Sequence, residues 1–93
     1  MTSTAEEKTF LSVAVAAIPR VAEIILEFPP DDRAGALETA ERRFLAAALD
    51  RCTEIAARSR VSIVMRRLRS HIERQRASEK KLQALFYRLT EPD

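Results

Sequence analysis

The sequence is poor in the residues that build tight turns and reactive sites. It has one glycine, one cysteine, one histidine and no tryptophan among 93 residues. Glycine usually makes up about 7% of a protein, so a single one leaves almost no supply for tight β-turns, phosphate-binding loops or flexible linkers. Cys52 has no second cysteine to bond, which excludes an intramolecular disulfide. We therefore expect a reducing, cytoplasmic location.

The scarcity of cysteine and histidine also argues against most catalytic and metal sites. A thiol nucleophile needs a base within hydrogen-bond reach, and Cys52 and His71 lie 19 residues apart in a mostly helical sequence. A structural zinc site needs four such ligands. Glu38 and Glu41 share a helix face, but carboxylate-bridged metal sites in helical bundles also require Glu-x-x-His pairs, which are lacking here. We predict no catalytic activity, no metal, no cofactor and no small-molecule substrate, with Cys52 in the core and His71 partly buried.

What the chain does contain is hydrophobic (46%) and charged (32%) residues. This hydrophobic fraction is too high for intrinsic disorder, and the length suits a single domain over residues 1–93. The first residues lack the basic start and the cleavage site of a secretory signal. Residues 9–28 have the length of a membrane span, but they include Arg20, Glu23 and Glu27. Such charges cost about 2.5–3.5 kcal/mol each at the bilayer centre, so we expect no membrane partner.

Two prolines divide the first half of the chain into two helices. Pro29 and Pro30 cannot continue a helix, and either Asp31 or Asp32 can cap the next one. Pro19 predicts a kink in the first helix or its division into two. Before the turn, one helix face collects apolar residues at spacings of three and four, namely Leu11, Ala14, Ile18, Val21, Ile25 and Phe28. Further apolar residues widen this face and predict a mostly buried first helix: Phe10, Val13, Ala17 and Ile24.

The second helix has no glycine or proline to end it. Its apolar residues keep the helical period, at Leu37, Ala40, Phe44, Ala48 and Cys52. A single helix over residues 33–90 would far exceed the usual length of about 11–12 residues. We therefore predict a break at Arg51, Cys52 and Thr53, with Thr53 as the N-cap of the third helix. A bend at residues 59–62 is the alternative.

The third helix, over residues 54–89, has an interrupted apolar stripe. The stripe begins with Val61, Val64, Met65, Leu68 and Ile72. Gln75 and Glu79 then occupy positions that should be apolar, and residues 73–81 are almost entirely polar. We infer that residues 61–72 pack on the first two helices, whereas residues 76–93 form a protruding helical extension. The fold class predicted is all-α, a helical hairpin plus a long basic C-terminal third helix, with three to four helices in total.

Beyond the interruption, four apolar residues need another surface to cover them: Leu82, Leu85, Phe86 and Leu89. A chain of this size is close to the balance between burial and conformational entropy, without a disulfide or metal to help. Because a symmetric dimer is the commonest solution, we predict a small helical protein–protein interaction module that binds itself as a homodimer, or else another protein.

Charge favours an alternative function, a regulator that binds nucleic acid. Residues 1–50 hold 5 basic and 9 acidic side chains, and residues 51–93 hold 11 basic and 5 acidic ones. Phosphate-binding candidates on the third helix are Arg66, Arg67, Arg69, Arg74, Arg76, Lys80 and Lys81. However, this basic arc covers more than half of the helix circumference, and few aromatic residues offer a stacking platform. The acidic first half also offers internal partners, so we rank this function second.

Overall fold

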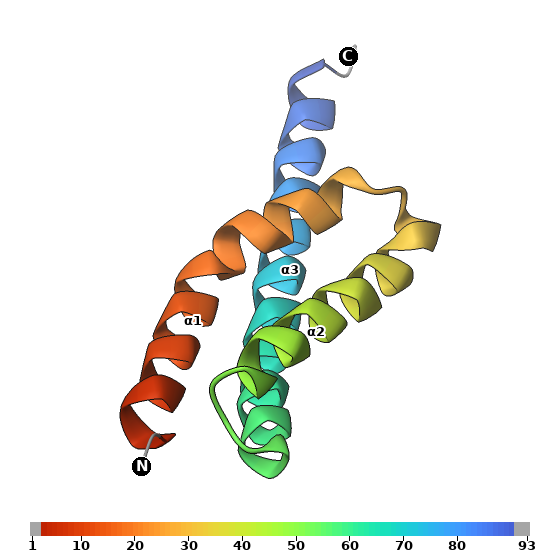
Figure 1. Ribbon diagram of the computed structural model, residues 1–93. Helices are drawn as coiled ribbons and strands as arrows, with labels where there is room; N and C mark the ends of the chain where they lie inside the picture. The colour runs from red at the N-terminus through yellow and green to blue at the C-terminus, as the bar shows by residue number, and fades with distance from the viewer. Residues whose placement is uncertain (1–2, 91–93) are drawn as a thin grey trace.

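The computed structural model describes residues 3–90, and the side chains of residues 8–89. The chain forms α1 (Ser3–Glu27), a short 3-10 turn η1 (Pro30–Asp32), α2 (Arg33–Leu49) and α3 (Glu54–Thr90) (Figure 1). Residues 3–90 contain no strand. The predicted all-α fold, a helical hairpin followed by a long third helix, is confirmed.

The α1–α2 turn uses backbone bonds in place of a side-chain cap. The backbone N–H of Asp32 donates to Pro29 O at 2.9 Å, and that of Arg33 donates to Pro30 O. Asp32 precedes α2 but makes no side-chain cap bond, and Asp31 makes none either. The predicted aspartate cap is wrong because the 3-10 turn already supplies acceptors for N–H groups at this end.

The α2–α3 break lies where it was predicted. The backbone N–H groups of Arg51 and Cys52 both donate to Ala48 O, at 3.0 and 2.8 Å. Thr53 Oγ1 accepts a bond from the N–H of Ala56 at 3.3 Å, as an N-cap residue does. From Glu54 onward α3 is unbroken through residues 59–62 and 76–78, so the alternative bend is not used.

The core lies where α1 and α2 cover the first half of α3 (Figure 1). The largest fully buried side chains are Met65, Leu68 and Val64. The core consists of Phe10, Ala14, Ile18, Ala22, Ile25, Ala48, Ala57, Val61, Val64, Met65, Leu68 and Ile72. Packing of residues 61–72 on the first two helices is therefore confirmed.

The prediction of a mostly buried α1 is wrong. Val13, Ile24 and Phe28 are 64%, 41% and 43% exposed. Contact with α3 covers one stripe of α1, and α2 has only one buried side chain, Ala48, among its described residues. The wider apolar face of α1 therefore reaches past the helices that cover it. Despite Pro19, α1 remains one helix and bends near its middle (Figure 1).

Within the described residues, one segment is long and apolar enough to cross a membrane, Lys8–Glu27 in α1. Its buried residues belong to the core, and Arg20 and Glu23 form an exposed ion pair of 3.2 Å on its outer side. The core helix of a soluble protein and a signal sequence near the N-terminus can have the same length and composition, so this one segment is weak evidence for a membrane span.

Candidate partner-binding surfaces

The second half of α3 leaves the body of the molecule. Every side chain at residues 73–89 is exposed. The molecule is elongated, with extents of 69 × 23 × 15 Å, and the end of α3 extends past α1 and α2 (Figure 1). The predicted extension covered residues 76–93, of which residues 91–93 lie outside the described part.

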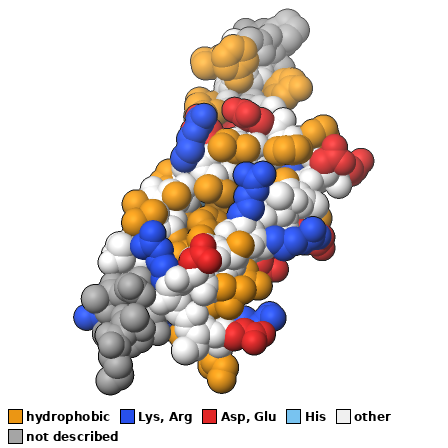
Figure 2. All heavy atoms as spheres, viewed as in Figure 1, with side chains coloured by type: hydrophobic (Ala, Val, Ile, Leu, Met, Phe, Trp, Pro, Cys, Tyr) orange, Lys and Arg blue, Asp and Glu red, His pale blue; other side chains and the backbone are white. Residues whose placement is uncertain are grey.

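The protruding helix presents one apolar face, here called the tail surface. It is formed by Leu82, Leu85, Phe86 and Leu89, which are 67%, 55%, 70% and 79% exposed. Spacings of three and four residues place these side chains together on a helix. Figure 2 shows hydrophobic side chains gathered at this end of the molecule. The interrupted apolar stripe in the sequence thus identified four side chains that are exposed on one face of α3.

Basic residues follow one edge of the tail surface. Arg74, Lys81 and Arg88 are exposed and succeed one another at intervals of seven residues. Seven residues are close to two helical turns, so the three cations form a row beside the apolar side chains. A partner of the tail surface therefore meets a positive edge.

A second apolar surface lies between α1 and α2, and the sequence reasoning missed it. We call it the α1–α2 groove; its volume is about 780 Å³. Its lining consists of Val21, Ile24, Ile25, Phe28, Asp32, Gly35, Ala36, Thr39, Ala40, Arg43 and Phe44. The signal that could have revealed it is the pairing of large α1 residues with a run of small α2 residues across the turn.

Small side chains on α2 keep the groove open. Gly35, Ala36 and Ala40 face the large side chains of Ile24 and Phe28. A Cβ atom added at Gly35 would meet no other atom within 4 Å. The groove therefore has room for side chains from outside.

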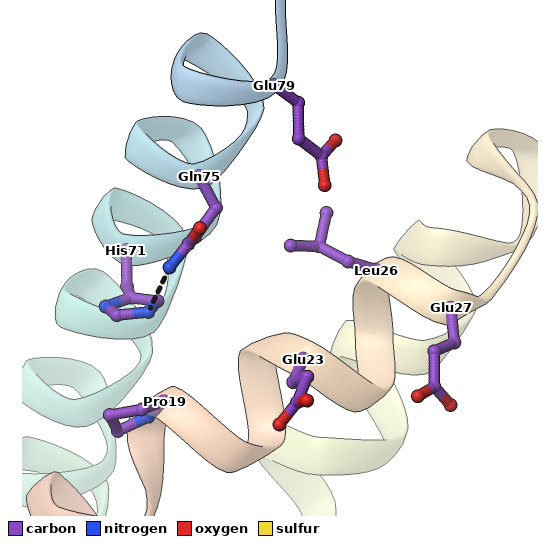
Figure 3. A pocket seen from close by; sticks show the side chains of 7 residues that line it. All are labelled: Pro19, Glu23, Leu26, Glu27, His71, Gln75 and Glu79. Carbon is purple, nitrogen blue, oxygen red and sulfur yellow. Dashed lines mark hydrogen bonds between the residues drawn. The ribbon is translucent and has the colours of Figure 1, made fainter. Parts of the chain in front are cut away.

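An acidic hollow lies on the other side of α1, against α3. It has a volume of about 520 Å³ and is lined by Pro19, Glu23, Leu26, Glu27, His71, Gln75 and Glu79 (Figure 3). The Glu79 carboxylate is directed toward Leu26, while Glu23 and Glu27 turn away from it. Among the described residues no three His, Cys, Asp or Glu side chains form a group that could hold a metal.

Cys52 and His71 occupy separate places. Cys52 is half-buried against the core at the α2–α3 turn, rather than fully within the core. His71 is half-buried on α3, as predicted, and its Nε2 lies 3.4 Å from Nε2 of Gln75. About five helical turns of α3 separate His71 from the turn that holds Cys52.

All seven candidate phosphate-binding residues are exposed: Arg66, Arg67, Arg69, Arg74, Arg76, Lys80 and Lys81. The expected pairing with the acidic half is absent, because within the described residues none of the seven has an ion-pair partner. The ion pairs that do form are local, such as Arg42–Glu38 at 3.8 Å and Arg58–Glu54 at 3.2 Å. Arg66, Arg67 and Arg74 line one hollow of about 540 Å³.

Comparison with known proteins gives no match to a family model, to a curated protein or to a solved structure. The two apolar surfaces and the basic face are therefore the observations on which a function can be proposed.

Proposed function

We propose that this chain is a cytoplasmic protein–protein interaction module that forms a homodimer through its tail surface. The observation that carries the proposal is the exposure of Leu82, Leu85, Phe86 and Leu89 on one face of a helix that has left the body. Full burial of a large apolar side chain contributes about 1.5–3 kcal/mol. A monomer forgoes this contribution at four positions, whereas a dimer gains much of it.

The proposal assigns no catalytic step to the chain. Its single cysteine and single histidine lie on different parts of the molecule, and the His71 ring faces Gln75. A module of this kind acts by placing its own surface against a partner. The apolar side chains supply the contact, and the basic edge orients it.

The first experiment introduces Leu82→Asp and Phe86→Asp together in one variant. Two charges on the tail surface would have to be desolvated at the interface, so we expect the wild-type dimer mass to fall to that of a monomer. Light scattering after size-exclusion chromatography measures the mass, and circular dichroism reports whether the body stays helical. Neither residue belongs to the core, so the fold should persist.

The matched control is Ala77→Asp with Ala84→Asp. These exposed residues lie on the opposite side of the same helix and add the same charge. This variant should remain a dimer. A wild-type monomer, or a dimer that survives Leu82→Asp and Phe86→Asp, would contradict the proposal.

The second candidate function, nucleic-acid binding, is favoured by the seven exposed basic side chains that lack internal ion pairs. Replacing Arg66, Arg67 and Arg69 with Glu should then abolish affinity for a labelled oligonucleotide and leave the oligomer mass unchanged. Affinity of the wild type should fall with salt, with a logarithmic slope of about −0.9 for each phosphate neutralised on duplex DNA. A measurable affinity that the variant retains would exclude this function for the basic face.

A further inference from the structure

We propose that each tail surface docks into the α1–α2 groove of a second copy of this chain, so that the two protomers exchange their C-terminal helices. This inference rests on the proposed homodimer and names the surface that receives the tail. It joins the two apolar surfaces that a single chain leaves exposed.

A dimer made only of two tail surfaces would be too small. At about 25 cal/mol/Å², the contribution of 1.5–3 kcal/mol corresponds to about 60–120 Å² for each side chain. Four side chains on each of two protomers then bury on the order of 500–1,000 Å², against about 1,200–2,000 Å² in a stable interface. A coiled coil is excluded too, since it needs about three to four apolar heptads, and Gln75, Ser78 and Glu79 interrupt this one.

Docking in the groove supplies the missing area. Ile24 and Phe28 are 41% and 43% exposed at its edge, and its volume of about 780 Å³ is in the range of sites that enclose a drug-sized ligand. Leu85 and Phe86 can therefore enter it side by side. Two-fold symmetry forms this contact twice, and each contact buries side chains of both the tail and the groove.

Charge is complementary between the tail and the turn at one end of the groove, whereas the groove's one cation, Arg43, lies farther along it. The α1–α2 turn carries the exposed carboxylates of Asp31 and Asp32, neither of which has an ion-pair partner within the described residues. The positive edge of the tail, Arg74, Lys81 and Arg88, is equally without one. An antiparallel pair of tails would instead set these three cations against the same three of the partner.

Symmetry also fixes the direction of the docked helix. If the partner's tail ran parallel to α3, each copy would be displaced along the axis and an open chain would form. A closed dimer needs the antiparallel direction, in which the tail enters from the turn, at the end of the body from which α3 protrudes (Figure 1). Lys81 then approaches the turn carboxylates, and Leu89 approaches Phe44 and Arg43 farther along the groove.

The test uses a groove variant, Gly35→Arg with Thr39→Arg, and a tail variant, Leu82→Asp with Phe86→Asp. Both groove positions are exposed, and a Cβ at Gly35 meets nothing within 4 Å. Arg favours a helix more than Gly or Thr does, so the fold should persist. Each variant alone should be a monomer, with at least a tenfold rise in the dimer Kd.

Mixing the two variants gives the decisive result. The intact tail of the groove variant can enter the intact groove of the tail variant, so a heterodimer with one of the two contacts should form. Light scattering measures the mass of the mixture, and fluorescence polarisation of one labelled variant gives the Kd. We expect an affinity between those of the wild type and of either variant alone.

The control variant, Ala46→Arg with Ser59→Arg, adds the same charge at exposed positions outside both surfaces and should remain a dimer. A groove variant that stays dimeric while the tail variant is monomeric would overturn groove docking but leave the tail-mediated homodimer standing. Failure of the mixture to form a heterodimer would also overturn groove docking. A wild-type monomer would overturn the proposed function itself.

Discussion

The side chain of Arg33 caps the C-terminal end of α1, a position where many helices have a glycine. Its Nε donates to Phe28 O and its Nη2 donates to Leu26 O, both at 3.1 Å. Leu26 O belongs to the last turn of α1, where the helix leaves acceptors without partners, and Phe28 O follows directly after the helix. The guanidinium charge also lies near the negative end of the α1 dipole. A chain whose single glycine is inside α2 thus closes α1 with a side chain from the next helix.

Arg33→Ala should destabilise the protein by about 1–2 kcal/mol. Hydrogen bonds from a charged donor contribute about 1.5–3 kcal/mol, and partial exposure of Arg33 lowers this value. Urea denaturation at one fixed protein concentration measures the change, since a dimer's stability depends on concentration. The control Arg42→Ala removes an exposed pair of 3.8 Å and should cost no more than about 0.5 kcal/mol. Equal effects of the two substitutions would show that the bonds of Arg33 do not stabilise the turn.

At the scale of the helices, the sequence predicted the boundaries better than the packing. Pro29 and Pro30 marked the first turn because proline cannot continue a helix, and Thr53 marked the second because its hydroxyl can cap one. These are local properties, which residues close in sequence decide. The absent cap at Asp32 shows the limit, since a short 3-10 turn offered the backbone an equally local alternative.

Burial of α1 could not be predicted in the same way. Periodicity shows which side of a helix is apolar, but the directions of its neighbours decide how much of that side is covered. Val13 and Ile24 fit the apolar face of α1 and are nevertheless exposed. The α1–α2 groove depends on the same helix directions, together with the small residues Gly35 and Ala40. The tail surface was accessible from the sequence because an interrupted stripe is a local pattern, and its use as an interface stays a prediction.

At the scale of the whole molecule, charge is divided between the two halves of the chain, but the packing of the helices does not bring these opposite charges together. The acidic residues lie mainly in the first half of the chain and the basic ones in the second. The ion pairs of the described residues nevertheless join neighbours within one helix. Because Lys81 and Arg88 lie on the protruding half of α3, opposite charges can meet between two copies more readily than within one.

Self-association should therefore weaken as salt is added. If Lys81 meets Asp31 and Asp32 at the turn, the two symmetric contacts of the dimer hold two such exposed pairs, at about 0.2–1 kcal/mol each, and both are screened at high ionic strength. Their loss corresponds to a rise of about tenfold in the dimer Kd, measurable by sedimentation equilibrium between 50 mM and 0.5 M sodium chloride (about 14 to 4 Å in screening length). A dimer formed by antiparallel tails would respond in the opposite sense, since salt screens the repulsion between like charges. Tighter association at high salt would thus contradict groove docking while supporting contact between the tails.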